Sequence, residues 1–403
     1  MACLLNQETS EPQTFGIREL IPVRVSRQES STQEPRLNLV IPGISKKVRS
    51  SGGITTALRL LERLQKEFKY VRLVVTHEGE AAIEPADWSG WVKNDGTFAP
   101  QSVVFLQDQD GILPLAATDC FIATFWSTAT YVSQVLKQQL QWYSGAIRRY
   151  VYLIQEYEPG FYAGSARHEY AKATYRDHDN AIAIFNSTPV DRYFKSQGLH
   201  FREHYAFDPM FHPKLLRKKS ELGSTLKERV VLAYGRPETA QNDFDLVVES
   251  LRRWATEFPL VRDWQVLSAG QPHADVPLGN GVMLQSLGTL TLDDYALQLA
   301  RSWVGISFAF NASTSYTARE MAEFGAWVIT NQFEYKKPTD LPANVFSLDQ
   351  ATPESVAHKL AWCCEQFHPG KTAVAPNLGS VFRREGEEFP FVDSLLKSWF
   401  GER

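Results

Sequence analysis

The chain alternates short apolar runs with amphipathic helical stretches from about residue 36 onwards. Leu37–Ile41 is an apolar run that ends at a proline and a glycine. Apolar residues then recur at helical spacing between Ile54 and Leu64, and Val71–Thr76 is the next apolar run. Strand, glycine-containing loop, helix and strand in this order predict a right-handed parallel unit.

The same alternation continues through two successive series. The first series predicts strands at 103–106, 120–124, 151–154 and 181–185, with helices at 127–139 and 165–174. The second predicts strands at 229–234, 265–268, 282–284, 303–307, 327–330 and 345–347, with helices starting near 244, 292, 315 and 353. Two such series predict an α/β protein of two Rossmann-like domains that face each other across a cleft.

Breaks in the pattern indicate the domain boundaries. We expect a mobile, polar tail over 1–34, with one short ordered piece near 17–25. The expected order is then a first domain at 35–210, a linker at 211–228 and a second domain at 229–385. A C-terminal helix at 386–403 should pack back across the domain boundary, because Leu395, Leu396, Trp399 and Phe400 are apolar.

Composition narrows the class of protein. The 403 residues are 43% hydrophobic and 22% charged, with a formal net charge of -4. This charge argues against a nucleic-acid partner. The four cysteines show no disulfide framework, since Cys363 and Cys364 are adjacent, so a reducing cytoplasmic compartment is expected. No apolar run reaches the roughly 18 residues that a membrane-spanning helix needs.

Five consecutive hydroxyl residues follow the predicted strand at 303–307 and open a helix: Ser313, Thr314, Ser315, Tyr316 and Thr317. A helix N-terminus has unpaired N–H groups that bind anions, phosphates above all. Glu320 follows about one turn later, where its carboxylate could accept hydrogen bonds from a ribose or another sugar. The pattern predicts the nucleotide end of a sugar-donor site. The alternative is an ordinary Ser/Thr N-cap with a solvated Glu320.

Two further charged residues stand directly after predicted strands. Arg236 follows a strand and Gly235, where a guanidinium could hold phosphate bidentately. Glu156 follows the strand at 151–154, where it could act as a base or as a ligand of an acceptor sugar. The alternatives are a salt bridge between domains for Arg236 and a surface carboxylate for Glu156.

Other candidate sites carry weaker signals. Gly52 and Gly53 permit a close backbone approach for an acceptor or a diphosphate, or only tight packing between strand and helix. Asp108 and Asp110 could hold a divalent cation, although Asp110–Gly111 also reads as a turn. Because a second α/β series follows, no metal or other cofactor is expected beyond the donor substrate. No cysteine and histidine set has zinc spacing.

Several of these motifs, taken in order, resemble glycosyltransferases of the GT-B fold and family-four type. Within that family the chain is similar to bacterial cell-surface-glycan rhamnosyltransferases of the WsaF type. The segments that carry the resemblance are Leu39–Ile54, Ala123–Thr128, Tyr152–Phe161, Ala233–Pro237 and Ser313–Ala322.

The resemblance implies a retaining transferase that takes L-rhamnose from dTDP-β-L-rhamnose without a metal. The second domain would bind the nucleotide sugar, with Arg236 and the turn Ser315–Thr317 on its phosphates and Glu320 on its ribose. The first domain would bind a glycan or lipid-linked saccharide acceptor. Peripheral contact with the inner face of the plasma membrane, through basic residues such as Lys218 and Lys219, and a homodimer are left open.

Two departures from the family pattern leave a second interpretation. The family commonly pairs two glutamates eight residues apart, whereas Ala312 stands at the first of these positions here. The family also often has a lysine shortly after the Gly-Arg turn, whereas residues 238–243 contain none. A non-catalytic GT-B-like module that binds glycan or partner proteins in polysaccharide assembly is therefore the alternative to an enzyme.

Overall fold

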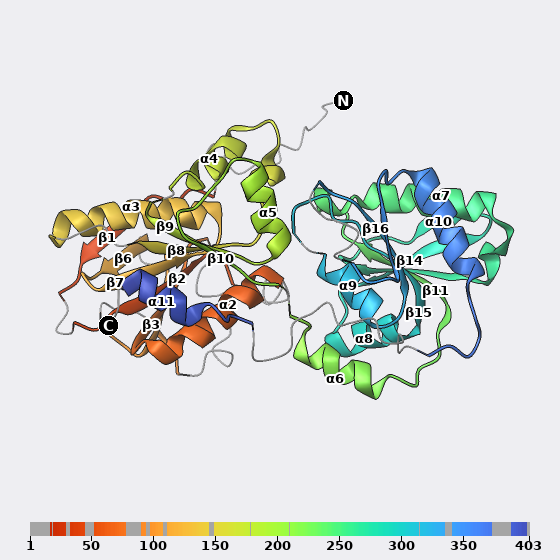
Figure 1. Ribbon diagram of the computed structural model, residues 1–403, viewed down its shortest axis with the longest axis horizontal. Helices are drawn as coiled ribbons and strands as arrows, with labels where there is room; N and C mark the ends of the chain where they lie inside the picture. Colours follow the sequence, from red (N-terminus) through yellow and green to blue (C-terminus); the bar gives the residue numbers. More distant parts are fainter. Residues whose placement is uncertain are drawn as a thin grey trace, which may run out of the picture. The chain divides into compact units, whose positions relative to one another are not determined.

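The computed structural model describes residues 17, 19–29, 33–44, 52–77, 90–93, 97–107, 111–144, 149–177, 179–208, 210–313, 315–334, 341–372 and 388–400. These residues form an eight-stranded sheet, a seven-stranded sheet and a two-stranded sheet (Figure 1). The chain has two compact units, residues 1–150 with 164–174, and residues 151–163 with 175–403.

The eight-stranded sheet is built from residues 36–206, which fall in the first predicted series. Its strands, in spatial order, are β10 (His204–Ala206), β9 (Ala181–Phe185), β8 (Tyr150–Ile154), β7 (Asp119–Ala123), β2 (Arg36–Ile41), β3 (Tyr70–Val75), β5 (Gln101–Phe105) and β4 (Val92–Lys93). Strand β2 pairs in parallel with both β3 and β7. Every residue of β2, β7, β8 and β9 is buried, as expected for parallel strands covered on both faces.

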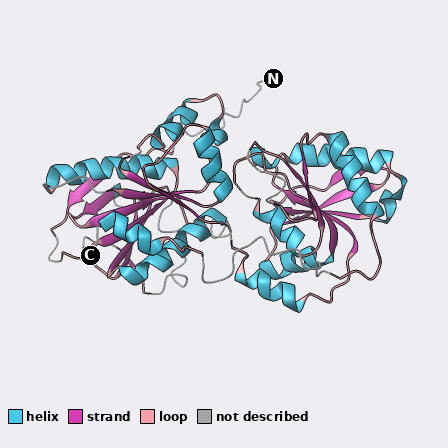
Figure 2. Ribbon diagram, in the orientation of Figure 1, coloured by secondary structure: helices cyan, strands magenta, loops and turns pink. Residues whose placement is uncertain are grey.

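Helices flank this sheet, as Figure 2 shows by colour. The helices that connect its strands are α2 (Gly52–Leu64), α3 (Trp126–Trp142), α4 (Ala166–Thr174) and α5 (Thr188–Ser196). The two-stranded sheet pairs β1 (Arg24–Arg27) in parallel with β6 (Ile112–Leu115). Strand β1 extends beyond the ordered piece that the sequence pattern predicts near 17–25, because β6 satisfies its backbone hydrogen bonds.

The seven-stranded sheet is built from the second predicted series. Its strands, in spatial order, are β13 (Val276–Gly279), β14 (Val282–Gly288), β12 (Gln265–Gly270), β11 (Glu228–Gly235), β15 (Ser302–Ile306), β16 (Trp327–Asn331) and β17 (Val345–Leu348). All of its pairs are parallel except the β13–β14 hairpin at one edge. The sequence pattern does not predict β13, which is short and only partly buried.

Two groups of helices cover the two faces of this sheet (Figure 1). Helices α7 (Phe244–Glu257) and α10 (Pro353–Glu365) share one apolar cluster with the sheet. Helices α6 (Pro213–Glu221), α8 (Leu292–Arg301) and α9 (Tyr316–Glu323) share another. On β15, a Cβ at Gly305 would lie 2.5 Å from Sδ of Met321 in α9. The glycine thus lets α9 pack closely against the strand that precedes it.

One segment differs from the pattern-based expectation. The linker expected at 211–228 contains α6, and β10 lies just before it. Phe211 and Leu215 pack into the core of the seven-stranded sheet, and this burial fixes α6 against that sheet. The C-terminal segment contacts β10, as Tyr205 stacks on Phe391 with ring centroids 5.2 Å apart. Helix α11 (Val392–Phe400) follows this contact in the chain.

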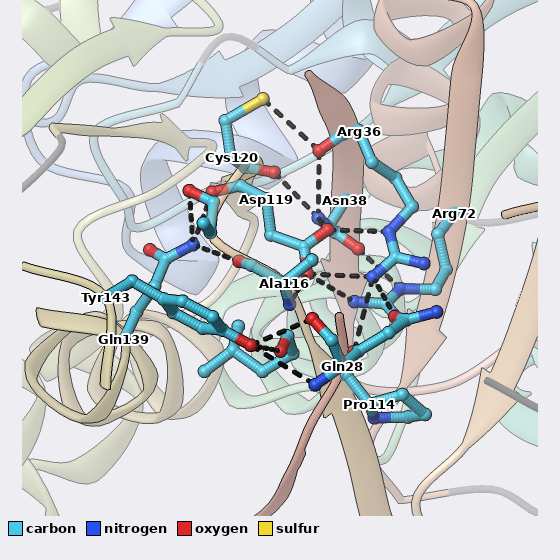
Figure 3. Close-up of polar contacts among 12 residues, drawn as sticks. Gln28, Arg36, Asn38, Arg72, Pro114, Ala116, Asp119, Cys120, Gln139 and Tyr143 are labelled. Atoms are coloured by element: carbon cyan, nitrogen blue, oxygen red, sulfur yellow. Dashed lines mark hydrogen bonds and ion pairs between the residues drawn. The ribbon is translucent and has the colours of Figure 1, made fainter. Parts of the chain in front are cut away.

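A buried ionic network joins three adjacent strands of the eight-stranded sheet (Figure 3). The carboxylate of Asp119 on β7 accepts hydrogen bonds from Nε and Nη2 of Arg36 on β2, at 2.6 and 2.8 Å. It also pairs with Arg72 on β3 at 3.4 Å, and all three side chains are fully buried. Asn38 bridges them, because it donates to Asp119 and accepts from Arg72.

Opposing effects set the charge states in this network. Burial by itself raises the pKa of the Asp119 carboxyl, but the charges of Arg72 and Arg36 bring that pKa below its ordinary value. Burial, together with the charge of Arg36, lowers the pKa of Arg72 to about 9. One carboxylate therefore neutralises two guanidinium groups only in part, and its removal leaves both charges in a medium of low dielectric.

We expect Asp119→Asn to destabilise the protein by roughly 3–5 kcal/mol, since it removes the counter-charge of two buried arginines. Urea unfolding followed by circular dichroism measures this loss. The matched control is Asp263→Asn, whose carboxylate is 67% exposed and lies 4.0 Å from Arg229. An exposed pair of this kind contributes about 0–1 kcal/mol. Equal unfolding midpoints for the two variants would contradict the assignment.

Candidate functional site

The chain turns between β15 and α9 at the place where the hydroxyl run predicts an anion site. Ser315 is the N-cap of α9, and its Oγ accepts from the backbone N of Ala318 at 3.3 Å. That Oγ also lies 3.2 Å from Oγ of Ser307, at the end of the strand. The N-cap alternative thus holds for Ser315, whereas Thr314 lies outside the described residues.

Two backbone N–H groups of this turn donate to a carboxylate. Ala312 N lies 3.1 Å from Oε1 of Glu156, and Ser313 N lies 3.3 Å from Oε2. Glu156 follows β8, belongs to the same compact unit as the turn, and also accepts from the backbone N of Tyr157 at 2.9 Å. Its side chain is only 8% exposed, so the surface-carboxylate alternative is wrong. The turn therefore has the geometry to bind both oxygens of an anionic group.

Glu158, two residues further on, occupies a different environment. It begins a short 3-10 helix (Glu158–Tyr162), is 2% exposed and accepts from the hydroxyl of Tyr152 at 3.3 Å. The two glutamates of this segment thus differ in role, because Glu158 is buried and bonded to Tyr152 while Glu156 bonds to the turn after β15.

Glu320 lies in α9, next to Tyr295 of α8. The hydroxyl of Tyr295 donates to Oε2 of Glu320 at 2.9 Å. Burial raises the pKa of Glu320 to about 7, and the bond from Tyr295 partly offsets this rise. Burial and the neighbouring Glu320 raise the pKa of Tyr295 well above its ordinary value, which keeps the phenol protonated as a donor. Glu320 is thus a half-buried acceptor rather than a solvated carboxylate.

Arg236 directly follows the carboxyl end of β11. A Cβ at Gly235 would lie 1.9 Å from Oγ of Ser268, so only glycine lets β11 and β12 end this close together. Nη1 of Arg236 lies 3.5 Å from the hydroxyl of Tyr234. Over the described parts of the chain, no carboxylate forms an ion pair with Arg236. The salt-bridge alternative therefore has no support in these residues. The guanidinium keeps donors for an anionic ligand.

Tyrosine side chains connect these groups. Tyr234, which contacts Arg236, contributes to the raised pKa of Tyr295, and Thr317 at the start of α9 is a hydrogen-bond partner of Tyr295. Sequence reasoning missed both tyrosines. Tyr295 lies on a predicted amphipathic helix, and no local signal indicates that its hydroxyl meets a glutamate 25 residues away.

The remaining candidates stand apart from this cluster. Gly52 and Gly53 begin α2, as predicted, but the basic loop before them lies outside the described residues. Asp108 and Asp110 also lie outside. In the part of the chain that is described, no group of three His, Cys, Asp or Glu residues is placed to hold a metal ion.

Three lysines of α6, Lys214, Lys218 and Lys219, form ion pairs with acidic side chains. Lys214 and Lys218 contact Asp293, at 2.5 and 3.4 Å, and Lys219 contacts Glu323 at 2.6 Å. These pairs reduce the positive charge that an anionic surface would meet. Among the described residues, no helix combines the length and apolar character needed to cross a membrane.

Family models match both series of strands and helices. The model of the WsaF N-terminal domain matches residues 36–188, and that of the WsaF C-terminal domain matches residues 229–361. The O-antigen biosynthesis protein RfbC of Myxococcus xanthus is 27% identical over 285 residues. That stretch covers 69% of this chain and 20% of the relative, so the chain spans about a fifth of the relative's length.

Solved structures share the fold at low sequence identity. Sucrose-phosphate synthase from Thermosynechococcus elongatus superposes with a TM-score of 0.59 at 12% identity. Anabaena HepE, solved in complex with UDP and glucose, gives 0.57 at 12% identity. Each comparison covers 91% of this chain and 100% of the other. These neighbours have the GT-B architecture, which confirms the predicted fold class.

The raised pKa of Glu320 predicts a specific pH dependence of stability. Between about pH 4.5 and 7 the folded chain holds a proton that the unfolded chain has released, so stability falls as pH rises. We expect Glu320→Gln to remove this loss. The variant should gain about 1–3 kcal/mol in unfolding free energy at pH 8 and almost nothing at pH 4.5.

Urea unfolding at both pH values measures the effect. Glu249→Gln is the control, because that carboxylate is 55% exposed on α7 and pairs with Arg252 at the surface. A pH-independent difference between Glu320→Gln and the parent protein would show that Glu320 does not carry the raised pKa.

Proposed function

This chain belongs to the WsaF family of GT-B glycosyltransferases, and we propose that it transfers L-rhamnose from dTDP-β-L-rhamnose to a surface-polysaccharide acceptor. The main support for a donor site at this turn is that the backbone N–H groups of Ala312 and Ser313 donate hydrogen bonds to the carboxylate of Glu156. A turn that already binds two carboxylate oxygens is suited to the oxygens of a nucleotide sugar. The similarity to RfbC, an O-antigen biosynthesis protein, supports the choice of acceptor.

The donor side of the proposal assigns one role to each group. Arg236 has no carboxylate partner among the described residues and would hold a phosphate oxygen. Because the hydroxyl of Ser315 caps α9, phosphate binding would fall to the backbone N–H groups of the turn and to the hydroxyls of Tyr316 and Thr317. Glu320 would accept a hydrogen bond from a hydroxyl of the pentose ring of the nucleotide. No step of this arrangement requires a metal.

Glu156 offers a solution to one departure from the family pattern. Ala312 stands where the family has its first glutamate, and the backbone N–H of Ala312 donates a hydrogen bond to the carboxylate of Glu156. We propose that Glu156 supplies the missing carboxylate at this position and takes the proton of the acceptor hydroxyl. Donor binding would exchange its hydrogen bonds to the turn for bonds from the substrates.

The acceptor side is assigned more broadly. A glycan or lipid-linked saccharide would bind on the first sheet's side, with Gly52 and Gly53 permitting close backbone approach at the start of α2. The family resemblance implies retention at the anomeric carbon. Proton–carbon coupling in the isolated product distinguishes a β-L-rhamnoside, formed by retention, from an α-L-rhamnoside, formed by inversion.

We expect Arg236→Ala to weaken dTDP binding by about 10- to 100-fold, since a hydrogen bond to a charged group contributes roughly 1.5–3 kcal/mol. Isothermal titration calorimetry measures the dissociation constant. Arg252→Ala is the control, because that guanidinium pairs with Glu249 on the exposed face of α7. An unchanged dissociation constant in Arg236→Ala, with the fold intact by circular dichroism, would remove Arg236 from the site.

We expect Glu156→Gln to lower turnover by about 10²- to 10⁴-fold, the usual contribution of a general base. The dissociation constant for dTDP should not increase, because Glu156 competes with the donor for the turn. Release of dTDP in the presence of acceptor reports turnover. Glu169→Gln, at a carboxylate 69% exposed on α4, is the control. Full activity of Glu156→Gln would exclude it as the base.

A further inference from the structure

Tyr295 and Glu320 form a hydrogen-bonded pair that two packed helices hold in place. Tyr295 belongs to α8 and Glu320 to α9, and the hydroxyl donates to Oε2 at 2.9 Å. The neighbours of the pair along both helices, Ala296, Leu299 and Met321, are buried in one apolar cluster. Packing on both sides therefore fixes the distance between phenol and carboxylate before any ligand binds.

The two carboxylate oxygens of Glu320 differ in their hydrogen bonding. Oε2 already accepts from Tyr295, whereas no described side chain or backbone group donates to Oε1. A ribose presents two neighbouring hydroxyls, at C2′ and C3′, and a carboxylate can accept one on each oxygen. A 2′-deoxyribose presents only the C3′ hydroxyl. The unequal oxygens thus match a ligand that has one hydroxyl to donate.

We propose that Tyr295 is a specificity residue that makes this site select 2′-deoxyribonucleoside diphosphates over ribonucleoside diphosphates. The inference rests on the proposed function, in which Glu320 faces the sugar of the donor nucleotide. The phenol occupies one acceptor position on Oε2, the oxygen that a C2′ hydroxyl would need. A ribonucleotide must then share Oε2 with the phenol, displace the phenol or leave a hydroxyl without a partner, and each of these weakens its binding relative to a deoxyribonucleotide.

The other polar groups around the phenol are consistent with this role. Tyr234 of β11 contributes to the raised pKa of Tyr295, Thr317 of α9 is its hydrogen-bond partner, and Arg236 contacts Tyr234. None of these residues is a carboxylate, so none replaces Glu320 as an acceptor for a sugar hydroxyl. Because burial raises the pKa of Glu320 to about 7, the comparison is made at pH 8.5, where its carboxyl is ionised.

The test measures dissociation constants for dUDP and UDP, which differ only in the C2′ hydroxyl, by calorimetry at pH 8.5. For the parent protein we expect UDP to bind at least 10-fold more weakly than dUDP. In Tyr295→Phe, which keeps the ring and removes the hydroxyl, the ratio should fall to within about 3-fold of unity, chiefly through tighter UDP binding. Tyr205→Phe is the control, because Tyr205 lies on β10 and its hydroxyl also donates to a glutamate, Glu203, at 2.7 Å.

The outcomes separate this inference from the proposed function. If neither dUDP, UDP nor dTDP binds the parent protein at millimolar concentration, the donor-site assignment itself is wrong. If dUDP and UDP bind equally well, or if Tyr295→Phe keeps the parent ratio, only the role of Tyr295 is wrong. A loss of binding for both nucleotides in Tyr295→Phe, with folding intact, would mean that the phenol positions Glu320 without discriminating between sugars.

Discussion

Hydrogen bonding between parallel strands that are buried on both faces is the constraint on which each half of this protein depends. Such strands must be apolar on both sides, and their connections must cross over as helices. All residues of β2, β7, β8 and β9 are accordingly buried, and so are those of β15. Parallel strands also end at the same edge, which concentrates the polar turns there.

The two ends of the strands carry different kinds of polar residues. Asp119, Arg36 and Arg72 lie at or near the amino ends of adjacent strands, where they are fully enclosed and bond to one another. Polar groups beyond the carboxyl ends keep unused hydrogen-bonding capacity among the described residues, as Arg236 does directly after β11 and Oε1 of Glu320 does in α9. Buried charge thus stabilises the architecture at one edge, and partly exposed charge lies at the other, where the donor site is proposed.

The turn after β15 brings three effects together. Gly305 lets α9 pack closely on the strand, Ser315 caps the helix, and the N–H groups of Ala312 and Ser313 bond to Glu156, which lies in the loop after β8. The result is a turn whose backbone donors are already oriented toward oxygen acceptors. A glycosyltransferase needs such fixed donors, because they stabilise charge without reorganising during the reaction.

The sequence by itself determined the alternation of strands and helices, the two-domain GT-B class, the start of α9, the position of Arg236 after a strand and that of Glu320 in a helix. These features depend on local periodicity and on residues close in the chain, such as the hydroxyl run before α9. Only the tertiary structure decided that Glu156 bonds to Ala312, that Tyr295 bonds to Glu320 and that Asp119 joins Arg36 and Arg72. The partners in these contacts lie 25 to 156 residues apart, and their meeting depends on strand order and helix packing, which leave no periodic signal in the sequence.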